Sequence, residues 1–375
     1  MTYKTWVEVS RSALVSNIQE LKRGFAPGVL FMAVVKSNAY GHGLRETAEI
    51  AGAAGADWFG VDNLDESLIL RKEGIGAPIL ILGYTPIANL REAAKNNVSL
   101  TVYNRETIYA LGKLKLKAKV HIKIETGTSR QGILPDEAPD FVKFVKKFPN
   151  IVLEGASTHF ANIEDTTDHS YAQKQLSVFK KTIVGLEKHD IQIPIKHIAC
   201  SAAAMLFPET HFNMARAGIA MYGLWPSRET YLSAKNIGKN IILQPALSWK
   251  TRVAQIKTLK KNTPVSYGLT EKVSRDSKIA ILPVGYFDGF DRGLSSAGSV
   301  IIRGHKCKIL GRICMNMCVA DITDAPGVKL EDEVILLGRG GKERITAEEI
   351  AGKIGTINYE VVSRINPALP RLIKK

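Results

Sequence analysis

Short apolar segments alternate with segments of helical periodicity over the first 225 residues, and this alternation limits the folds that the chain can adopt. Most of the apolar segments are rich in Val, Ile and Leu with little polar alternation, as expected for parallel strands buried on both faces. Eight of them are predicted strands: 31–36, 58–61, 78–83, 98–103, 120–125, 152–159, 195–199 and 212–216. The predicted helices between them are 43–54, 62–72, 86–96, 104–114, 135–148 and 170–189. Eight strands, each followed by a helix or crossover, favour an α/β fold with a TIM-type (β/α)8 barrel over an open doubly wound sheet.

The pattern changes after residue 225. Residues 226–240 are polar and irregular, which predicts a linker. Apolar runs at 247–256, 277–282, 299–302 and 333–337 follow, separated by Gly, Pro and Asp, as is typical of an antiparallel β-domain, and one short helix is expected near 347–354. We therefore predict a barrel over 1–235 and a mostly antiparallel β-domain over 236–375, with the first ten or so residues packing either with the barrel or with the second domain.

The charge balance suggests a nucleic acid or membrane partner, but the distribution of charge does not support one. The chain has 51 Lys and Arg against 36 Asp and Glu, a formal net charge of +15. The basic residues are spread thinly and do not alternate with aromatic residues, as a binder of single strands requires. No apolar run reaches the ~18 residues that span a bilayer, and the first residues lack a secretory signal pattern. We expect a cytoplasmic protein with no nucleic acid or membrane partner.

The four cysteines do not predict a metal site. Cys200, Cys307, Cys314 and Cys318 form no Cys-x-x-Cys pair and no paired Cys/His ligand set. They are expected to be cytosolic thiols, with no structural metal.

The residues that could carry chemistry follow the ends of predicted strands, where a barrel enzyme builds its site. Lys36 closes the first strand and offers an amine for imine chemistry. Arg130 and Ser201 follow later predicted strands, and His159 and Arg216 are the last residues of theirs. Together they suit an anionic ligand with a phosphate and a carboxylate. Three of them have a structural alternative: Lys36 as a surface lysine at the barrel rim, His159 as a core histidine and Arg216 as an ion-pair partner.

Eight motifs, in order along nearly the whole chain, resemble those of the alanine racemases, which are pyridoxal phosphate (PLP) enzymes with a barrel and a C-terminal β-domain. The motifs are AVVKSNAYGHG (33–43), ETGTSRQG (125–132), THFANIED (158–165), NMARAGIAMYGL (213–224), VSYG (265–268), VGYFDGF (284–290), GRICMNM (311–317) and TINYEVVSRI (356–365). Eight motifs matched in the same order identify the family far more specifically than any single motif does.

The resemblance implies a cofactor site built around Lys36, which would hold PLP as a Schiff base. Arg216 matches the family residue that meets the pyridine nitrogen, with His159 behind it. The phosphate-binding set is matched by Tyr40, Ser201, Gly218, Ile219 and Tyr359.

The resemblance also implies a substrate site that two subunits of a homodimer share. Arg130 matches the residue near the cofactor phenolate and the substrate carboxylate, and Lys123 falls where some members carry a carbamylated lysine that holds this arginine. Tyr267 matches the second catalytic base and Met315 the residue whose amide helps bind the carboxylate. In the family these last two reach the site from the other subunit.

The expected function is therefore PLP-dependent racemisation of L-alanine and D-alanine by two bases, Lys36 and Tyr267, supplying D-alanine for peptidoglycan. The alternatives are a racemase of another small amino acid such as serine, a PLP carrier protein of related barrel fold, and a related barrel decarboxylase. Asn316 stands where the family usually has aspartate, Cys200 where it has asparagine, and Ser37 where it has alanine. These departures leave strict preference for alanine open.

Overall fold

The computed structural model describes residues 2–375, which form two compact units. One unit consists of Ala13–Ala39 and Leu44–Pro245. The other consists of the segment up to Ser12, the short segment Tyr40–Gly43 and the segment Ala246–Lys375. The first unit thus continues beyond residue 235, where the sequence analysis placed the boundary.

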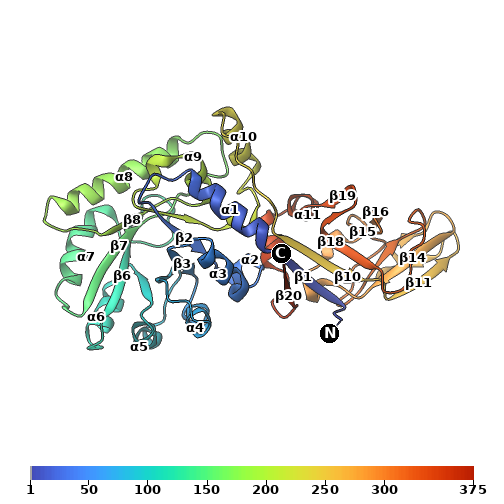
Figure 1. Ribbon diagram of the computed structural model, residues 1–375, viewed down its shortest axis with the longest axis horizontal. Coiled ribbons are helices and arrows are strands. Elements are labelled where there is room, and N and C mark those ends of the chain that lie inside the picture. Colours follow the sequence, from blue (N-terminus) through green and yellow to red (C-terminus); the bar gives the residue numbers. More distant parts are fainter. Residues whose placement is uncertain (1) are drawn as a thin grey trace. The chain divides into compact units, whose positions relative to one another are not determined.

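The first unit is a nearly closed barrel of eight parallel strands, in the order β8-β7-β6-β5-β4-β3-β2-β9 (Figure 1). Its strands are β2 (Leu30–Val34), β3 (Trp58–Val61), β4 (Ile79–Ile81), β5 (Ser99–Val102), β6 (Ala118–Lys123), β7 (Ile151–Ser157), β8 (Ile195–His197) and β9 (Met214–Ala217). Each lies at one of the eight predicted positions, and most of their residues are buried. The predicted TIM-type barrel is therefore confirmed. Pairing of β2 with β9, with Met32 opposite Arg216, brings the ends of the first and last strands together.

Helices surround these strands, and their stripes of apolar residues explain why (Figure 1). On α8, the residues Ala172, Leu176, Phe179, Ile183 and Leu186 recur every three or four positions and are all buried. The helices of this unit are α1 (Arg11–Arg23), α3 (Leu44–Ala53), α4 (Leu64–Lys72), α5 (Leu90–Lys95), α6 (Arg105–Gly112), α7 (Ala138–Val145), α8 (Ser170–Glu187), α9 (Ser201–Leu206) and α10 (Arg228–Asn236). The 3-10 turns are η1 (Ile87–Asn89), η2 (Pro135–Glu137), η3 (Pro208–Thr210) and η4 (Ile219–Tyr222).

The prediction of an irregular linker over 226–240 is wrong, because Arg228–Asn236 forms α10. Ser227 caps the helix, its hydroxyl accepting a hydrogen bond from the amide of Thr230 at 2.8 Å. The face with Thr230, Ser233 and Ala234 is buried. A helix whose buried face is this small and polar has little apolar periodicity, so the sequence pattern did not show it.

The second unit is built mainly on antiparallel sheets, which confirms the fold predicted for the C-terminal part. The strands are β1 (Thr5–Ser10), β10 (Leu247–Arg252), β11 (Gln255–Leu259), β12 (Pro264–Val265), β13 (Glu271–Lys272), β14 (Ser277–Leu282), β15 (Ser299–Ile302), β16 (His305–Lys308), β17 (Cys318–Asp321), β18 (Glu333–Gly340), β19 (Glu343–Ile345) and β20 (Arg371–Lys374). The largest sheet has the order β16-β15-β18-β10-β1-β20, with β19 beside β18, and only β1 and β20 pair in parallel. β1, from the first residues of the chain, lies between two strands from the C-terminal part.

Two short helices accompany these sheets. α11 (Ala347–Ile354) is the helix that the sequence predicted, and α12 (Asn358–Ser363) is an addition to that prediction. The 3-10 turns of this unit are η5 (Tyr267–Leu269), η6 (Tyr286–Asp288) and η7 (Arg292–Leu294). None of the helices found within residues 2–375 is long and apolar enough to cross a membrane.

Candidate active site

Lys36 follows β2 and begins a left-handed turn, labelled α2 (Lys36–Tyr40). Ser37, Asn38, Ala39 and Tyr40 all have φ between 52° and 56°, a conformation that non-glycine residues rarely adopt. The amide of Ala39 donates to the carbonyl of Val35 at 2.8 Å. Strained backbone of this kind persists only where surrounding structure holds it, and it is concentrated at functional sites.

Two side chains hold this turn in the barrel. The Asn38 side chain accepts a hydrogen bond from the amide of Leu44 at 2.9 Å, and the amide of Asn38 donates to the Glu66 carboxylate at 3.2 Å. Lys36 is partly exposed, with Nζ 3.9 Å from Oδ1 of Asp62, which follows β3. The backbone next to Lys36 is therefore held in place, and its amine is accessible and near a carboxylate.

Arg216, on β9, is the buried charge of the barrel. Its side chain donates from Nη1 to Nδ1 of His197 at 2.5 Å and from Nη2 to Nδ1 of His159 at 3.2 Å. The same Nη2 also donates to the carbonyls of Thr158 and Ile198. A guanidinium has only donors, so both imidazoles must accept and must be neutral. Burial, reinforced by the charge of Arg216, lowers the pKa of His159 and of His197 well below the usual value.

Arg216 keeps its own charge at neutral pH. Burial lowers the pKa of its guanidinium to about 10, which still leaves it protonated at pH 7. The guanidinium of Arg216 is therefore a fixed positive charge on β9, in contact with His197 at the end of β8.

Ser201, Gly218 and Ile219 form a group of buried hydrogen-bonding atoms after the same two strands. The Ser201 hydroxyl accepts hydrogen bonds from the amides of Gly218 at 3.0 Å and Ala220 at 3.4 Å. The Ser201 hydroxyl, which accepts from these two amides, keeps its own proton to donate, as a group that binds phosphate does.

The turn after β6 carries Arg130, which is exposed, and its conformation is held by Glu125. The Glu125 carboxylate accepts from the amides of Gly127 at 2.5 Å, Thr128 at 2.6 Å and Arg130 at 3.1 Å. Burial alone would raise the pKa of Glu125, but these hydrogen bonds outweigh it and lower the pKa to about 2. Lys123, at the end of β6, is half-buried, and burial together with Arg216 and Arg130 lowers the pKa of its amine well below the usual value.

The remaining predicted site residues belong to the second unit. Tyr40 and Tyr359, the latter on α12, have ring centroids 6.1 Å apart at an angle of 50°. Tyr267 begins η5 and is 72% exposed, and Met315 is 54% exposed.

Tyr267 and Met315 are part of what we call the exposed apolar surface, formed by Tyr267, Leu269, Phe287, Met315 and Met317. Backbone and side-chain contacts connect its segments: the amide of Phe287 donates to the carbonyl of Met315 at 3.0 Å, and Ser266 contacts Sγ of Cys314 at 3.6 Å. Large side chains grouped in this way on a surface mark an interaction site.

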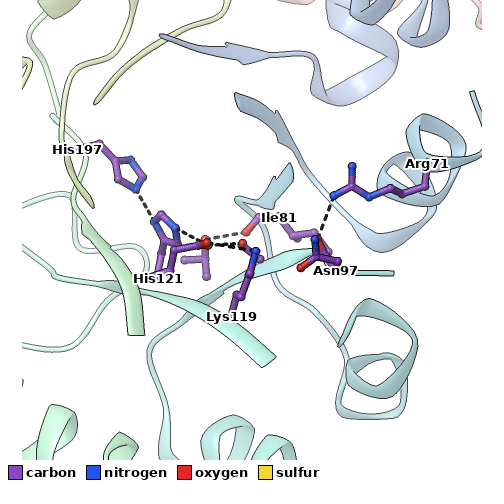
Figure 2. A network of polar contacts seen from close by, with 9 residues as sticks. Arg71, Ile81, Asn97, Lys119, His121 and His197 are labelled. Carbon is purple, nitrogen blue, oxygen red and sulfur yellow. Dashed lines mark hydrogen bonds and ion pairs between the residues drawn. The ribbon is translucent and has the colours of Figure 1, made fainter. Parts of the chain in front are cut away.

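His197 was not predicted from the sequence as a site residue, and neither were two polar residues behind it, His121 and Glu154. Nδ1 of His121 lies 3.0 Å from Nε2 of His197, and Nε2 of His121 lies 3.3 Å from the Glu154 carboxylate (Figure 2). A signal was available, since an imidazole within a strand expected to be buried on both faces needs a hydrogen-bond partner.

Within the described part of the chain, no three His, Cys, Asp or Glu side chains are arranged to hold a metal ion. Cys200, Cys307, Cys314 and Cys318 are all present as thiols. Burial and the nearby charge of Glu164 raise the pKa of Cys200 to about 11, so this thiol beside Ser201 stays protonated.

Comparisons with known proteins match both parts of the chain. Residues 9–226 match the family model "Alanine racemase, N-terminal domain" and residues 246–373 the model "Alanine racemase, C-terminal domain". The chain is 41% identical to an alanine racemase of Methanococcus maripaludis, over 99% of each chain, and 42% identical to one of Halothermothrix orenii, over 100% of this chain and 98% of the other. The crystal structure of an alanine racemase from Bacillus anthracis with bound L-Ala-P is 37% identical, with a TM-score of 0.94 over 100% of this chain and 96% of the other.

Proposed function

The chain belongs to the alanine racemase family, and from this premise we propose that it interconverts L-alanine and D-alanine with PLP as cofactor and with Lys36 and Tyr267 as the two bases. The observation that carries the proposal is the position of Lys36 and Arg216. Lys36 follows β2 and Arg216 lies near the end of the paired strand β9, so an accessible amine and a buried guanidinium lie at the same end of the barrel.

The residues present fit PLP, which is an aldehyde with a pyridine ring and a phosphate. Lys36 would hold it covalently, Arg216 would meet the pyridine nitrogen, and the phosphate set is Tyr40, Ser201, Gly218, Ile219 and Tyr359. The buried guanidinium and the hydroxyl and amides beside it support this assignment. When bound, PLP stabilises negative charge at Cα of an amino acid joined to it.

Inversion at Cα needs a base on one face of the substrate and an acid on the other. The Lys36 amine serves one face, and we propose that the Tyr267 hydroxyl of a second subunit serves the opposite one. Exposure of Tyr267 within the exposed apolar surface supports a homodimer with shared sites.

Arg216 directs the reaction towards racemisation. Its guanidinium stays charged and does not readily give up a proton, so it does not protonate the pyridine nitrogen as a carboxylic acid would. His159 behind it is neutral and accepts from it, and therefore supplies no proton to Arg216. By leaving the pyridine nitrogen without a proton, Arg216 would limit how far negative charge spreads into a bound PLP ring and so would limit side reactions such as transamination.

Arg130 and the backbone of Met315 are proposed to bind the substrate carboxylate, with Arg130 also near the cofactor phenolate. The hydrogen bond from the Arg130 amide to Glu125 supports a role for Arg130 in binding the carboxylate, because it fixes the backbone from which the Arg130 side chain extends. The lowered pKa of Lys123 favours a neutral amine, which is the form that carbon dioxide modifies, and this supports a carbamylated lysine beside Arg130.

The absorbance spectrum of the purified protein tests the cofactor assignment. We expect a band of lysine-bound PLP that Lys36→Ala abolishes, while Lys72→Ala, which changes a lysine on α4, retains it. Survival of the band in Lys36→Ala overturns the assignment.

A coupled assay for the opposite enantiomer of alanine tests the activity. We expect Tyr267→Phe to slow both directions of turnover, because each direction uses both faces. A faster rate with alanine than with serine, lysine or arginine is expected, and a broad profile over the four contradicts the proposed specificity. Release of carbon dioxide would instead identify a decarboxylase.

We further propose that the protein acts in the cytoplasm and supplies D-alanine for peptidoglycan, a role that family membership supports. Expression in a bacterial strain that requires D-alanine should restore growth without it, and Lys36→Ala should fail to do so.

A further inference from the structure

A row of polar side chains crosses the interior of the barrel from Arg216 to Glu154. Arg216 contacts His197, His197 contacts His121, and His121 contacts Glu154, over 2.5, 3.0 and 3.3 Å. Both imidazoles are completely buried, and Figure 2 shows them facing one another. We call these four residues the barrel relay.

The chemistry of Arg216 at one end and Glu154 at the other determines which ring nitrogen of each histidine carries the proton. Arg216 only donates, so Nδ1 of His197 accepts and its Nε2 carries the proton. That Nε2–H donates to Nδ1 of His121, whose own Nε2–H donates to the Glu154 carboxylate. A carboxylate only accepts, so the two ends require the same arrangement. All three hydrogen bonds therefore run from Arg216 towards Glu154.

The backbone is shaped to admit this relay. In the pairing of β6 with β7, Val120 lies opposite Leu153 and His121 opposite Gly155, so Glu154 is the extra residue of a β-bulge. Bulges redirect a side chain and are frequent near active sites. A Cβ on Gly155 would lie 2.4 Å from Nδ1 of His121, so only glycine leaves space for the ring.

The barrel relay links Arg216 by hydrogen bonds to a carboxylate, Glu154, which also forms an ion pair with Lys119. Arg216 is 5% exposed, and no carboxylate of residues 2–375 forms an ion pair with it. An uncompensated buried charge is costly. Glu154 is the acidic group joined to Arg216 by hydrogen bonds, and Ser99 at 2.5 Å and Lys119 at 3.6 Å hold its carboxylate in place.

We propose that His121 and Glu154 are positioning residues for the racemase: together they fix the proton arrangement of His197 and thereby the orientation of Arg216 beneath the cofactor. The kinetic part of this inference rests on the proposed function, whereas the proton arrangement does not.

The proton arrangement is measured first, on the full-length protein loaded with PLP and labelled with 15N-histidine. Two-bond 1H–15N correlation spectra distinguish protonated from unprotonated ring nitrogens, and single histidine variants assign the signals. We expect His121 and His197 to be neutral, each with the proton on Nε2. A proton on Nδ1 of either ring overturns the proposal, whether or not the protein racemises alanine.

Two substitutions at His121 separate positioning from packing. His121→Phe keeps a ring that packs edge-on against Trp58 but removes both nitrogens, whereas His121→Gln keeps one acceptor and one donor in the same order. A packing role predicts that phenylalanine is tolerated better, and the barrel relay predicts that glutamine is. The matched control is His211→Phe, at a buried imidazole that packs edge-on against Phe25 outside the relay.

We expect His121→Phe to weaken PLP binding about tenfold and to lower kcat about tenfold, with KM for alanine within about twofold, as is typical when a residue that orients a site group is lost. His121→Gln should recover most of both losses, and His211→Phe should show neither. Equal or better PLP affinity in His121→Phe than in His121→Gln overturns the proposal.

Glu154→Gln provides a second test if His121→Phe does not fold. It keeps the size and an acceptor but removes the charge, so PLP affinity should fall several-fold. Glu187→Gln, which removes a carboxylate paired with Lys196 at 2.8 Å, is the control and should leave PLP affinity unchanged. Equal PLP affinity in these two variants overturns the role of Glu154.

Discussion

The carboxylate of Glu125 accepts a hydrogen bond from the amide of Arg130 at 3.1 Å, and so fixes the backbone from which this arginine extends. Two further amides and the hydroxyl of Thr128 donate to the same carboxylate. The position of Arg130 therefore depends on a charge five residues before it.

Glu125→Gln should destabilise the protein in a pH-dependent way. The pKa of Glu125 is about 2 in the folded protein against an ordinary 4.5, so its contribution is present above about pH 4.5 and is lost as the pH falls towards 2. At pH 7 we expect the free energy of unfolding to fall by about 1.5–3 kcal/mol, the range for hydrogen bonds to a charged group. Urea denaturation of both proteins at pH 7, 4.5 and 3 measures the difference, and a difference independent of pH contradicts the argument.

Gly41→Ala should be much more damaging than Gly74→Ala. Both glycines have positive φ, 84° and 80°, but a Cβ on Gly41 would lie 1.9 Å from the carbonyl oxygen of Val362, whereas one on Gly74 would meet nothing within 4 Å. We expect losses in unfolding free energy of about 3 kcal/mol or more for Gly41→Ala and about 1 kcal/mol for Gly74→Ala. Denaturant titration of the two variants measures these losses. Equal losses in unfolding free energy would show that the positive φ, and not the contact with Val362, determines the cost of the substitution.

Ser201→Ala should weaken binding of PLP. The substitution removes the hydroxyl that the amides of Gly218 and Ala220 use, together with a proposed ligand of the phosphate. We expect about a tenfold rise in the dissociation constant of PLP, equivalent to about 1.4 kcal/mol, measured by absorbance titration. Ser67→Ala, at a buried serine whose hydroxyl donates to the carbonyl of Leu64, is the control and should bind PLP normally.

Phe287→Asp should separate the proposed dimer. Phe287 is 63% exposed within the exposed apolar surface, and a carboxylate there cannot be buried against a second copy without a large cost. Sedimentation velocity should show monomers and the coupled assay a loss of activity. Leu330→Asp, at an exposed leucine outside that surface, should leave both unchanged. An active dimer of Phe287→Asp removes this surface from the interface.

Mixing two inactive variants tests whether the sites are shared. A dimer of one Lys36→Ala subunit and one Tyr267→Phe subunit has one intact site if Lys36 and Tyr267 come from different subunits. Random association then recovers about a quarter of the wild-type activity. Sites within single subunits predict no recovery, which the coupled assay on co-expressed, purified protein would reveal.

The barrel could be predicted because its strands are buried on both faces, so each appears as an apolar run such as Phe31–Val35. β1 has no comparable signal. Its six residues pair with β10 and β20, far along the chain, and only these partners make it a strand. α10 was missed because its buried face is small and polar, although Ser227 is an ordinary N-cap residue.

Motif resemblance identified the candidate site residues, but it did not extend to the groups behind them. His121 and Glu154 lie in strands where their neighbours are apolar, and the bulge that turns Glu154 towards His121 has no sequence signature beyond the glycine that follows. The hydrogen bonds of the barrel relay join residues of four strands and depend on register, which a single sequence does not specify.

The place of β1 between β10 and β20 has a consequence for biosynthesis. A ribosome makes β1 about 240 residues before β10 and about 360 residues before β20, so at 5–20 residues per second β1 waits on the order of 10 to 50 seconds for its first partner. Throughout that interval the strand Thr5–Ser10 has two unpaired edges, the condition in which strands associate with other chains. The sheet of the second unit is therefore completed only after β20 has left the ribosome, and until then the nascent chain is exposed to aggregation.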